Sequence, residues 1–144
     1  MNNLRDLYQL ASDNDIGIFC FDLGPIGACA IQDAAGKCYV AIDPMQLSTT
    51  AEEAYRVAHE LGHCQTGSFY HKFTPLQTRE RCEWRAEKLA MLQLLPLSDI
   101  NRCVRQGYTE PWEISEQLDV PESLVRKALA YYQEQNLQER GVAP

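Results

Sequence analysis

The chain has 144 residues, of which 45% are hydrophobic and 23% are charged, a balance typical of one globular domain with its own core. Its formal net charge of −7 opposes binding to nucleic acid, which requires clustered lysine and arginine. No stretch is apolar for long enough to cross a membrane, and the N-terminus lacks the apolar segment of a signal peptide. We therefore expect a cytoplasmic protein without a membrane partner.

The first third of the chain predicts one helix followed by three strands. Leucines recur on one side of residues 3–12, as in an amphipathic helix. Strand-like runs follow at residues 16–23, 26–32 and 38–43. The links between them are short and contain Gly24-Pro25 and a polar turn. Two such links predict hairpins, and therefore a small antiparallel three-stranded sheet in an α+β fold.

Residues 59–63 have the sequence HELGH, which is a HExxH motif. A helix repeats every 3.6 residues, so His59 and His63 point the same way and can hold one zinc ion. Glu60 can then reach a water molecule on that ion. The small and apolar residues that share the opposite face are Ala54, Ala58 and Leu61. This helix therefore has one side to bury and another that presents the histidines.

A catalytic zinc ion usually has three protein ligands, so one is missing from the motif. In the metzincin spacing HExxHxxGxxH it would be a third histidine, but here Gly67 comes one place late and Phe69 occupies the histidine position. His71 follows two residues later, so neither the glycine nor the third histidine of this pattern stands at its required position. The other solution is a glutamate on a second helix, which we expect over residues 79–95.

Two glutamates of this second helix lie on the side that should pack inward. In projection Glu83 and Glu87 share a face with alanine and leucine, whereas the arginine and lysine residues lie away from it. Buried carboxylates need a cation or hydrogen bonds. We therefore predict Glu83 as the third zinc ligand, with Glu87 hydrogen-bonded to the outer nitrogen of a ligand histidine. Glu80 and Glu87 are the alternative third ligands.

The segments that carry these residues are HELGH, Gly67-Ser68-Phe69-Tyr70 and Glu83-Trp84-Arg85-Ala86-Glu87. Together they resemble the ImmA/IrrE-type metallopeptidase family of gluzincin-like HExxH zinc peptidases. The family's third zinc ligand falls on Glu83. Arg85 stands where a glutamate is usual, and Glu87 where asparagine or aspartate is usual. The resemblance implies a zincin-like fold and, often, a regulatory protease that cuts a specific transcriptional repressor.

The last third of the chain predicts short helices, one starting at Ser98 and others at residues 110–119 and 121–135. Their apolar pattern is like that of a helix-turn-helix, which would bind DNA. From residue 110 to 140, however, seven acidic residues stand against three basic ones, and this excess should repel phosphate. We expect this region to pack or to bind a protein partner.

The predicted organisation is a metallopeptidase core over residues 1–97, a C-terminal helical subregion of the same domain over 98–138, and a frayed tail over 139–144. Six cysteines form no CxxC pair, so in a cytosolic protein we expect free, buried thiols; a second zinc site is the alternative. Cys64 follows His63, and a step of one residue turns it away from the zinc.

The predicted activity is peptide-bond hydrolysis with one zinc ion per chain. Glu60 would take a proton from the zinc-bound water and pass it to the departing amine. A further donor to the oxyanion is needed, and Tyr70 and His71, on the loop after the zinc helix, are the candidates. Ordinary surface or packing roles are the alternative for both. A non-catalytic, zinc-stabilised regulatory module is the alternative function, although such a module has no need of Glu60.

Overall fold

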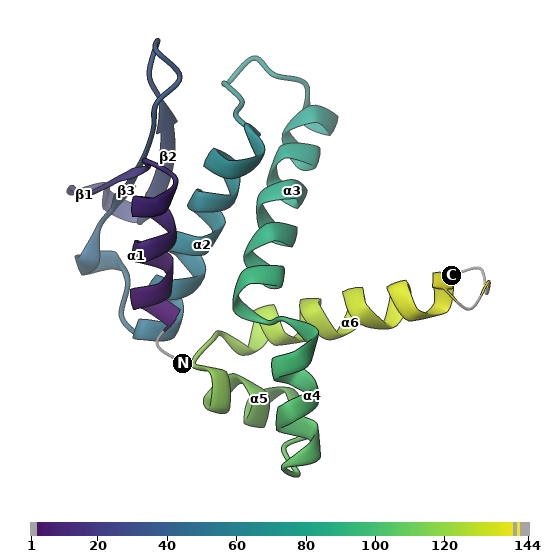
Figure 1. The fold of residues 1–144 in the computed structure, drawn as a ribbon. Helices are drawn as coiled ribbons and strands as arrows, with labels where there is room; N and C mark the ends of the chain where they lie inside the picture. The colour runs from purple at the N-terminus through teal and green to yellow at the C-terminus, as the bar shows by residue number, and fades with distance from the viewer. Residues whose placement is uncertain (1–2, 140, 142–144) are drawn as a thin grey trace.

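The computed structural model describes residues 3–139 and 141 (Figure 1). In chain order the elements are α1 (Asn3–Asp13), β1 (Gly17–Cys20), η1 (Gly24–Ile26), β2 (Ala28–Gln32), β3 (Cys38–Ile42), η2 (Pro44–Gln46), α2 (Thr50–Thr66), α3 (Leu76–Leu94), α4 (Leu97–Arg105), α5 (Pro111–Leu118) and α6 (Glu122–Glu139). The predicted α+β class is confirmed. Of the predicted frayed tail, only residues 139 and 141 lie within the described part.

The sheet is mixed, with strand order β1-β3-β2. β2 and β3 form the expected antiparallel hairpin, but β1 pairs with β3 in parallel, so the prediction of an all-antiparallel sheet is wrong. The Gly24-Pro25 link is not a hairpin, because it forms a 3₁₀ turn between glycines with positive φ that carries the chain to the far side of β3. The buried Asp43 carboxylate fixes this connection by accepting a hydrogen bond from Leu23 N at 3.0 Å.

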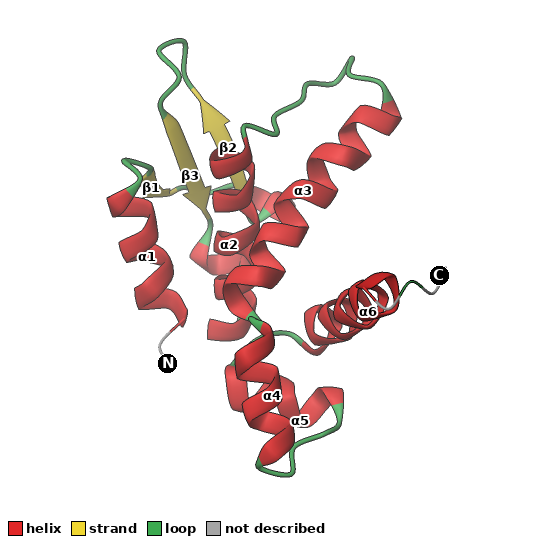
Figure 2. Ribbon diagram, turned by 45° about the vertical axis from the view of Figure 1, so that its right-hand side comes forward, coloured by secondary structure: helices red, strands yellow, loops and turns green. Residues whose placement is uncertain are grey.

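Helix α2 is the centre of the fold, because it contacts α1, both strands of the hairpin and α3 (Figures 1 and 2). Its N-terminus is capped by Thr49, whose side chain accepts a hydrogen bond from Glu52 N at 3.0 Å. Its apolar residues Ala54, Val57, Ala58 and Leu61 are buried, so the predicted inward face is confirmed. This packing fixes the direction in which the HELGH segment points.

The C-terminal helices α4, α5 and α6 lie beyond the lower end of α3, and α6 extends away from the rest of the molecule (Figures 1 and 2). Their core is formed by Ile100, Ile114, Val120, Leu124, Val125 and Ala128. The helix predicted from residue 110 begins with a capping box between Glu110 and Glu113. Among the described residues, no helix has both the length and the apolar content needed to span a membrane.

Candidate metal centre

The metal centre is built where α2 and α3 pack closely together. A Cβ atom added at Gly62 would lie 2.6 Å from the carbonyl oxygen of Ala86, so only glycine allows this distance between the two backbones. Ala86 itself is completely buried. The small residues at the contact therefore let the two helices approach closely. This approach brings the side chains of both helices to a common point.

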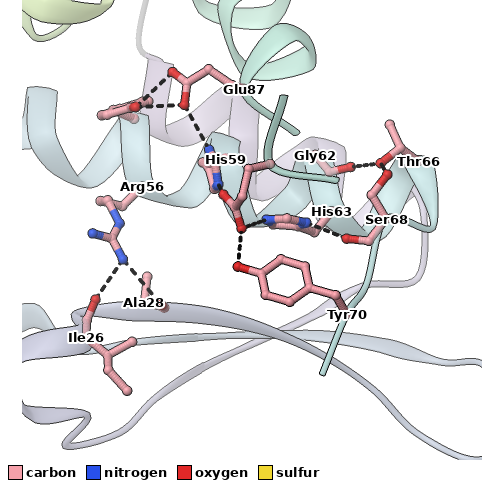
Figure 3. Close-up of polar contacts among 12 residues, drawn as sticks. Ile26, Ala28, Arg56, His59, Gly62, His63, Thr66, Ser68, Tyr70 and Glu87 are labelled. Atoms are coloured by element: carbon pink, nitrogen blue, oxygen red, sulfur yellow. Dashed lines mark hydrogen bonds and ion pairs between the residues drawn. The ribbon is translucent and has the colours of Figure 1, made fainter. Parts of the chain in front are cut away.

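At that point His59, His63 and Glu83 converge, and one ligand atom from each lies within 4.8 Å of the others. Nε2 of His59 is 2.8 Å from Oε2 of Glu83, and Nε2 of His63 is 3.3 Å from Oε1 (Figure 3). Tetrahedral zinc with bonds of about 2.1 Å places its ligand atoms about 3.4 Å apart. The two imidazoles and the carboxylate therefore form a group that could hold a metal ion, with donor types that zinc accepts.

Polar groups behind the histidines fix their orientation. The Nδ1 atom of His63 is 2.6 Å from the carbonyl oxygen of Ser68, so Nδ1–H donates there and the Nε2 lone pair faces the candidate ion. Nδ1 of His59 is 3.2 Å from Oε2 of Glu87, which is an ion-pair distance, although the angle is not that of a hydrogen bond. The Tyr55 hydroxyl contacts both oxygens of Glu87, at 2.8 and 2.9 Å, and holds that carboxylate in place.

The charges at the centre balance one another. Burial lowers the pKa of the His59 imidazole, but the nearby carboxylates, that of Glu87 first, outweigh it and leave the pKa raised. Burial raises the pKa of Glu83, but the hydrogen bond from Tyr70 and the adjacent histidines outweigh it and leave the pKa lowered. Without an ion, the His59 imidazole thus favours its protonated form and the Glu83 carboxyl its ionised form, and a metal ion bound to His59 would displace the imidazole proton.

A cavity of about 520 Å³ opens beside the centre, and Glu60 lines it. The metal ligands and residues of strand β2 line the same cavity, and Glu60 is only 8% exposed. Burial raises the pKa of this carboxyl above its usual value. A carboxylate that is desolvated and faces an open space is suited to exchange a proton with something bound in that space.

Of the other residues predicted for the site, some lie at the cavity or contact a ligand and others are exposed away from it. Tyr70 lines the cavity, and its hydroxyl donates to Oε1 of Glu83 at 2.7 Å. His71 does not line this cavity; it is exposed on the loop and accepts a hydrogen bond from Phe73 N. Glu80 is exposed and outside the ligand group, and Glu87 contacts a ligand instead of joining the group. Among the described residues the candidate metal site therefore has three ligands.

All six cysteines are free thiols, and the three buried ones are Cys38, Cys82 and Cys103. Cys64 lies on the other side of α2 from the metal centre, where it lines a second cavity together with Cys38. Burial and the neighbouring Cys38 thiol raise the pKa of Cys64 to about 12. This thiol is consequently protonated at neutral pH.

Three residues of the site were not predicted from the sequence. Tyr55 lies four residues before His59 and Arg56 four residues before Glu60, so helical spacing could have placed both on the correct faces. Ser68 contributes a backbone carbonyl, which any residue type provides, so no sequence signal identified it.

Models of known protein families and curated proteins show no match to this chain.

Proposed function

We propose that this protein is a zinc-dependent peptidase that cleaves a specific protein, and we extend to it the expectation of a transcriptional repressor as substrate. The observation that carries the proposal is the buried Glu60 carboxylate, which lines a cavity next to a convergent His-His-Glu group. Zinc bound there would lower the pKa of a water ligand and polarise a peptide carbonyl. A module that used zinc only for stability would need neither the cavity nor Glu60.

In the proposed reaction Glu60 is the general base and then the general acid. Its raised pKa brings the carboxyl nearer to neutrality, where it can both accept and release a proton. It takes the proton from the attacking water and delivers it to the amine nitrogen as the peptide C–N bond breaks. The cavity admits an extended peptide from the solvent side of the HELGH segment.

Tyr70 is the proposed donor to the oxyanion. The hydrogen bond with Glu83, together with partial burial, raises the pKa of its phenol to about 12, so the hydroxyl keeps its proton at neutral pH. From its present position on Glu83 it would turn to the oxygen of the tetrahedral intermediate. His71 does not line the cavity and is not part of this proposal.

The strand β2 supplies an edge on which a peptide can lie. It is an outer strand of the sheet, and Ala28 and Ala30 line the cavity. Hydrogen bonds from Asp43 N to Gly27 O and from Asp33 N to Lys37 O show that odd-numbered residues of β2 pair with β3. Because pairing alternates along a strand, the backbone groups of Ala28 and Ala30 face the open edge. An extended substrate would pair there.

Zinc content and peptide cleavage, measured on the same preparations, test this function. We expect one zinc ion per chain in the wild type and in Glu60→Gln, and at least about a 100-fold loss of zinc affinity in Glu83→Ala. The exposed Glu80→Ala is the matched control and should keep its zinc. Cleavage should be lost in Glu60→Gln despite bound zinc, and Tyr70→Phe should lower its rate about 10²- to 10³-fold without zinc loss.

Two outcomes would reject the proposal in different ways. A wild type that binds zinc but cleaves no peptide or protein offered to it would support the regulatory module instead. A wild type that binds no zinc, or a Glu83→Ala variant that binds it as well as Glu80→Ala does, would remove the metal centre itself.

A further inference from the structure

Arg56 is the one basic residue with a long side chain among the described residues that line the main cavity. It stands on α2, one turn before Glu60, and is half-buried. Its Nη2 atom donates to the carbonyl oxygens of Ile26 at 2.7 Å and Ala28 at 3.3 Å (Figure 3). One end of the guanidinium is therefore fixed by the backbone of the strand that borders the cavity.

The contact with Arg56 limits how far along β2 a peptide can pair with the strand's open edge. The Ala28 carbonyl faces the cavity side of the strand, and Arg56 occupies it. The N–H and C=O groups of Ala30, two residues on, have no such partner among the described residues. A peptide that pairs with this edge can therefore use Ala30, and beyond it reaches the guanidinium of Arg56 instead of another backbone group.

Within the described part of the chain Arg56 forms no ion pair, although its positive charge acts on the Glu60 carboxyl one turn on, where it opposes the rise in pKa that burial causes. Among the described residues no carboxylate lies within ion-pair distance of it, and its hydrogen bonds are to neutral carbonyls. Arginine has five N–H donors in a planar fork that matches a carboxylate, and the two carbonyls use only one nitrogen. A half-buried guanidinium with unused donors in a substrate cavity is a binding site for a negatively charged group.

From this geometry we infer that Arg56 determines specificity by binding an aspartate or glutamate side chain of the substrate. The inference rests on the proposed peptidase function and names a feature of its substrate. Arg56 also lies one helical turn before Glu60 and acts on its charge, so the test must separate a change in substrate preference from a change in rate.

The position of the acidic residue follows from the way α2 and β2 run. At the start of β2, Ala28 contacts Arg56 near the start of α2. At the end of β2, Gln32 lines the second cavity together with Cys64 near the end of α2, so the helix and the strand run in the same direction. Arg56 is five residues from the midpoint of the two histidines, which is about 7.5 Å along a helix. An extended chain covers this distance in about two residues. The acidic residue should therefore lie about two residues from the scissile bond.

The test uses the full zinc-loaded chain and a pool of tryptic peptides from unrelated denatured proteins. Cleavage sites are read by mass spectrometry for the wild type, Arg56→Gln and Arg56→Lys. Arg81→Gln is the matched control, because Arg81 is exposed on α3 and outside the cavity. Zinc content and unfolding of each variant are measured first, since Arg56 also holds β2. In parallel, the pool is passed over immobilised Glu60→Gln chain with and without Arg56→Gln, which records binding without cleavage.

We expect acidic residues to be enriched on one side of the cleaved bond in the wild type and in Arg81→Gln. The enrichment should fall about tenfold or more in Arg56→Gln and fall less in Arg56→Lys, which retains the charge but not the planar fork. If Arg56 acted only through Glu60 or only as a brace for β2, all peptides would be cleaved more slowly in Arg56→Gln with their preference unchanged. That result would overturn the inference and leave the peptidase function standing.

The binding arm separates the two proposals when the wild type cleaves nothing. A peptidase specific for one protein need not cleave this pool, so the proposed function is then decided by the zinc and cleavage tests above, and Arg56 by binding alone. Arg56 would still be supported as the site for an acidic segment if the Glu60→Gln chain retains acidic peptides and the double variant Arg56→Gln/Glu60→Gln does not. Equal retention of acidic and neutral peptides would overturn it.

Discussion

The metal-centre half of the molecule and the C-terminal helices bury different kinds of side chain. Of the buried polar residues, Asp43, Glu60, His63 and Ser68 belong to the segment up to α3. Beyond it the buried polar residue is Asp99, which is paired with Arg102 at 3.2 Å. Buried charges cost stability unless they are paired or bind a ligand. The first half therefore buries polar groups at the candidate metal site and at the β1–β2 connection, whereas the second buries mainly apolar residues.

The helix contacts of the two halves also differ in the size of the residues that form them. α2 and α3 meet through Gly62 and Ala86, so their backbones come close and their polar side chains meet beside the contact. α5 and α6 meet through large apolar residues, Ile114, Leu124 and Val125, none of which is exposed. Small residues position a site but bury little apolar area, and large residues do the reverse. The stability of the site thus depends on packing that lies elsewhere.

The largest expected effect is on the stability of the C-terminal packing. Leu124→Ala should lower the free energy of unfolding by about 2–5 kcal/mol, because it leaves a cavity in a completely buried position. Leu92→Ala, at a position that is 38% exposed, is the control and should cost much less. Denaturant unfolding measures both. In the conditions where the variant stays folded, we expect zinc affinity to be unchanged; a parallel loss of zinc would show that the two halves are not separable.

Gly62→Ala tests the contact between α2 and α3. Helix propensity alone predicts a gain of about 1 kcal/mol from this change. The added Cβ would lie 2.6 Å from a backbone oxygen, however, and a backbone cannot move aside like a flexible side chain. We expect a net loss of about 1–3 kcal/mol in unfolding free energy and weaker zinc binding, because the two helices must separate. A stabilised variant with full zinc affinity would contradict the close packing.

The ligand group was predicted from the sequence because its geometry is local. Two histidines four residues apart must share a helix face, and a glutamate that shares a face with alanine and leucine must turn inward. The structure brings His59, His63 and Glu83 together as this pattern indicates. The sheet was predicted less well, since the parallel pairing of β1 depends on where the Gly24-Pro25 turn sends the chain. The residue pattern of one strand does not show whether the neighbouring strand runs parallel or antiparallel to it.

The contacts behind the ligands could be predicted only in part. Glu87 was expected to hydrogen-bond the outer nitrogen of a ligand histidine, and the structure places it at ion-pair distance from Nδ1 of His59, 3.2 Å, without the angle of a hydrogen bond. The carbonyl of Ser68 and the contact of Arg56 with β2 were not foreseen, because both depend on how a loop or strand passes a helix. Such contacts join segments far apart in the sequence, and residue periodicity contains no information about them.

Glu87→Gln tests whether the carboxylate behind His59 serves the metal. The amide keeps the size of the side chain and can still accept from Tyr55, but it removes the negative charge next to the imidazole. Loss of an orienting carboxylate typically lowers metal affinity 10- to 100-fold, and we expect a change in this range by zinc titration. Glu80→Gln removes an exposed charge from the same helix and should change affinity little. Equal effects of the two substitutions would mean that only the overall charge matters.

The smallest expected effect concerns an ion pair that joins the two halves at the metal centre. Lys127 of α6 lies 3.7 Å from Glu87, and its side chain is 54% exposed. A pair this long and this exposed is screened by solvent and contributes less than about 1 kcal/mol. Lys127→Met keeps the apolar stem, so we expect unfolding and zinc affinity to change little. Arg126→Met, which breaks the pair with Glu122 on the same helix, is the control. A large loss of zinc affinity in Lys127→Met alone would show that α6 acts on the metal centre, and the separation of the metal centre from the C-terminal packing would then be wrong.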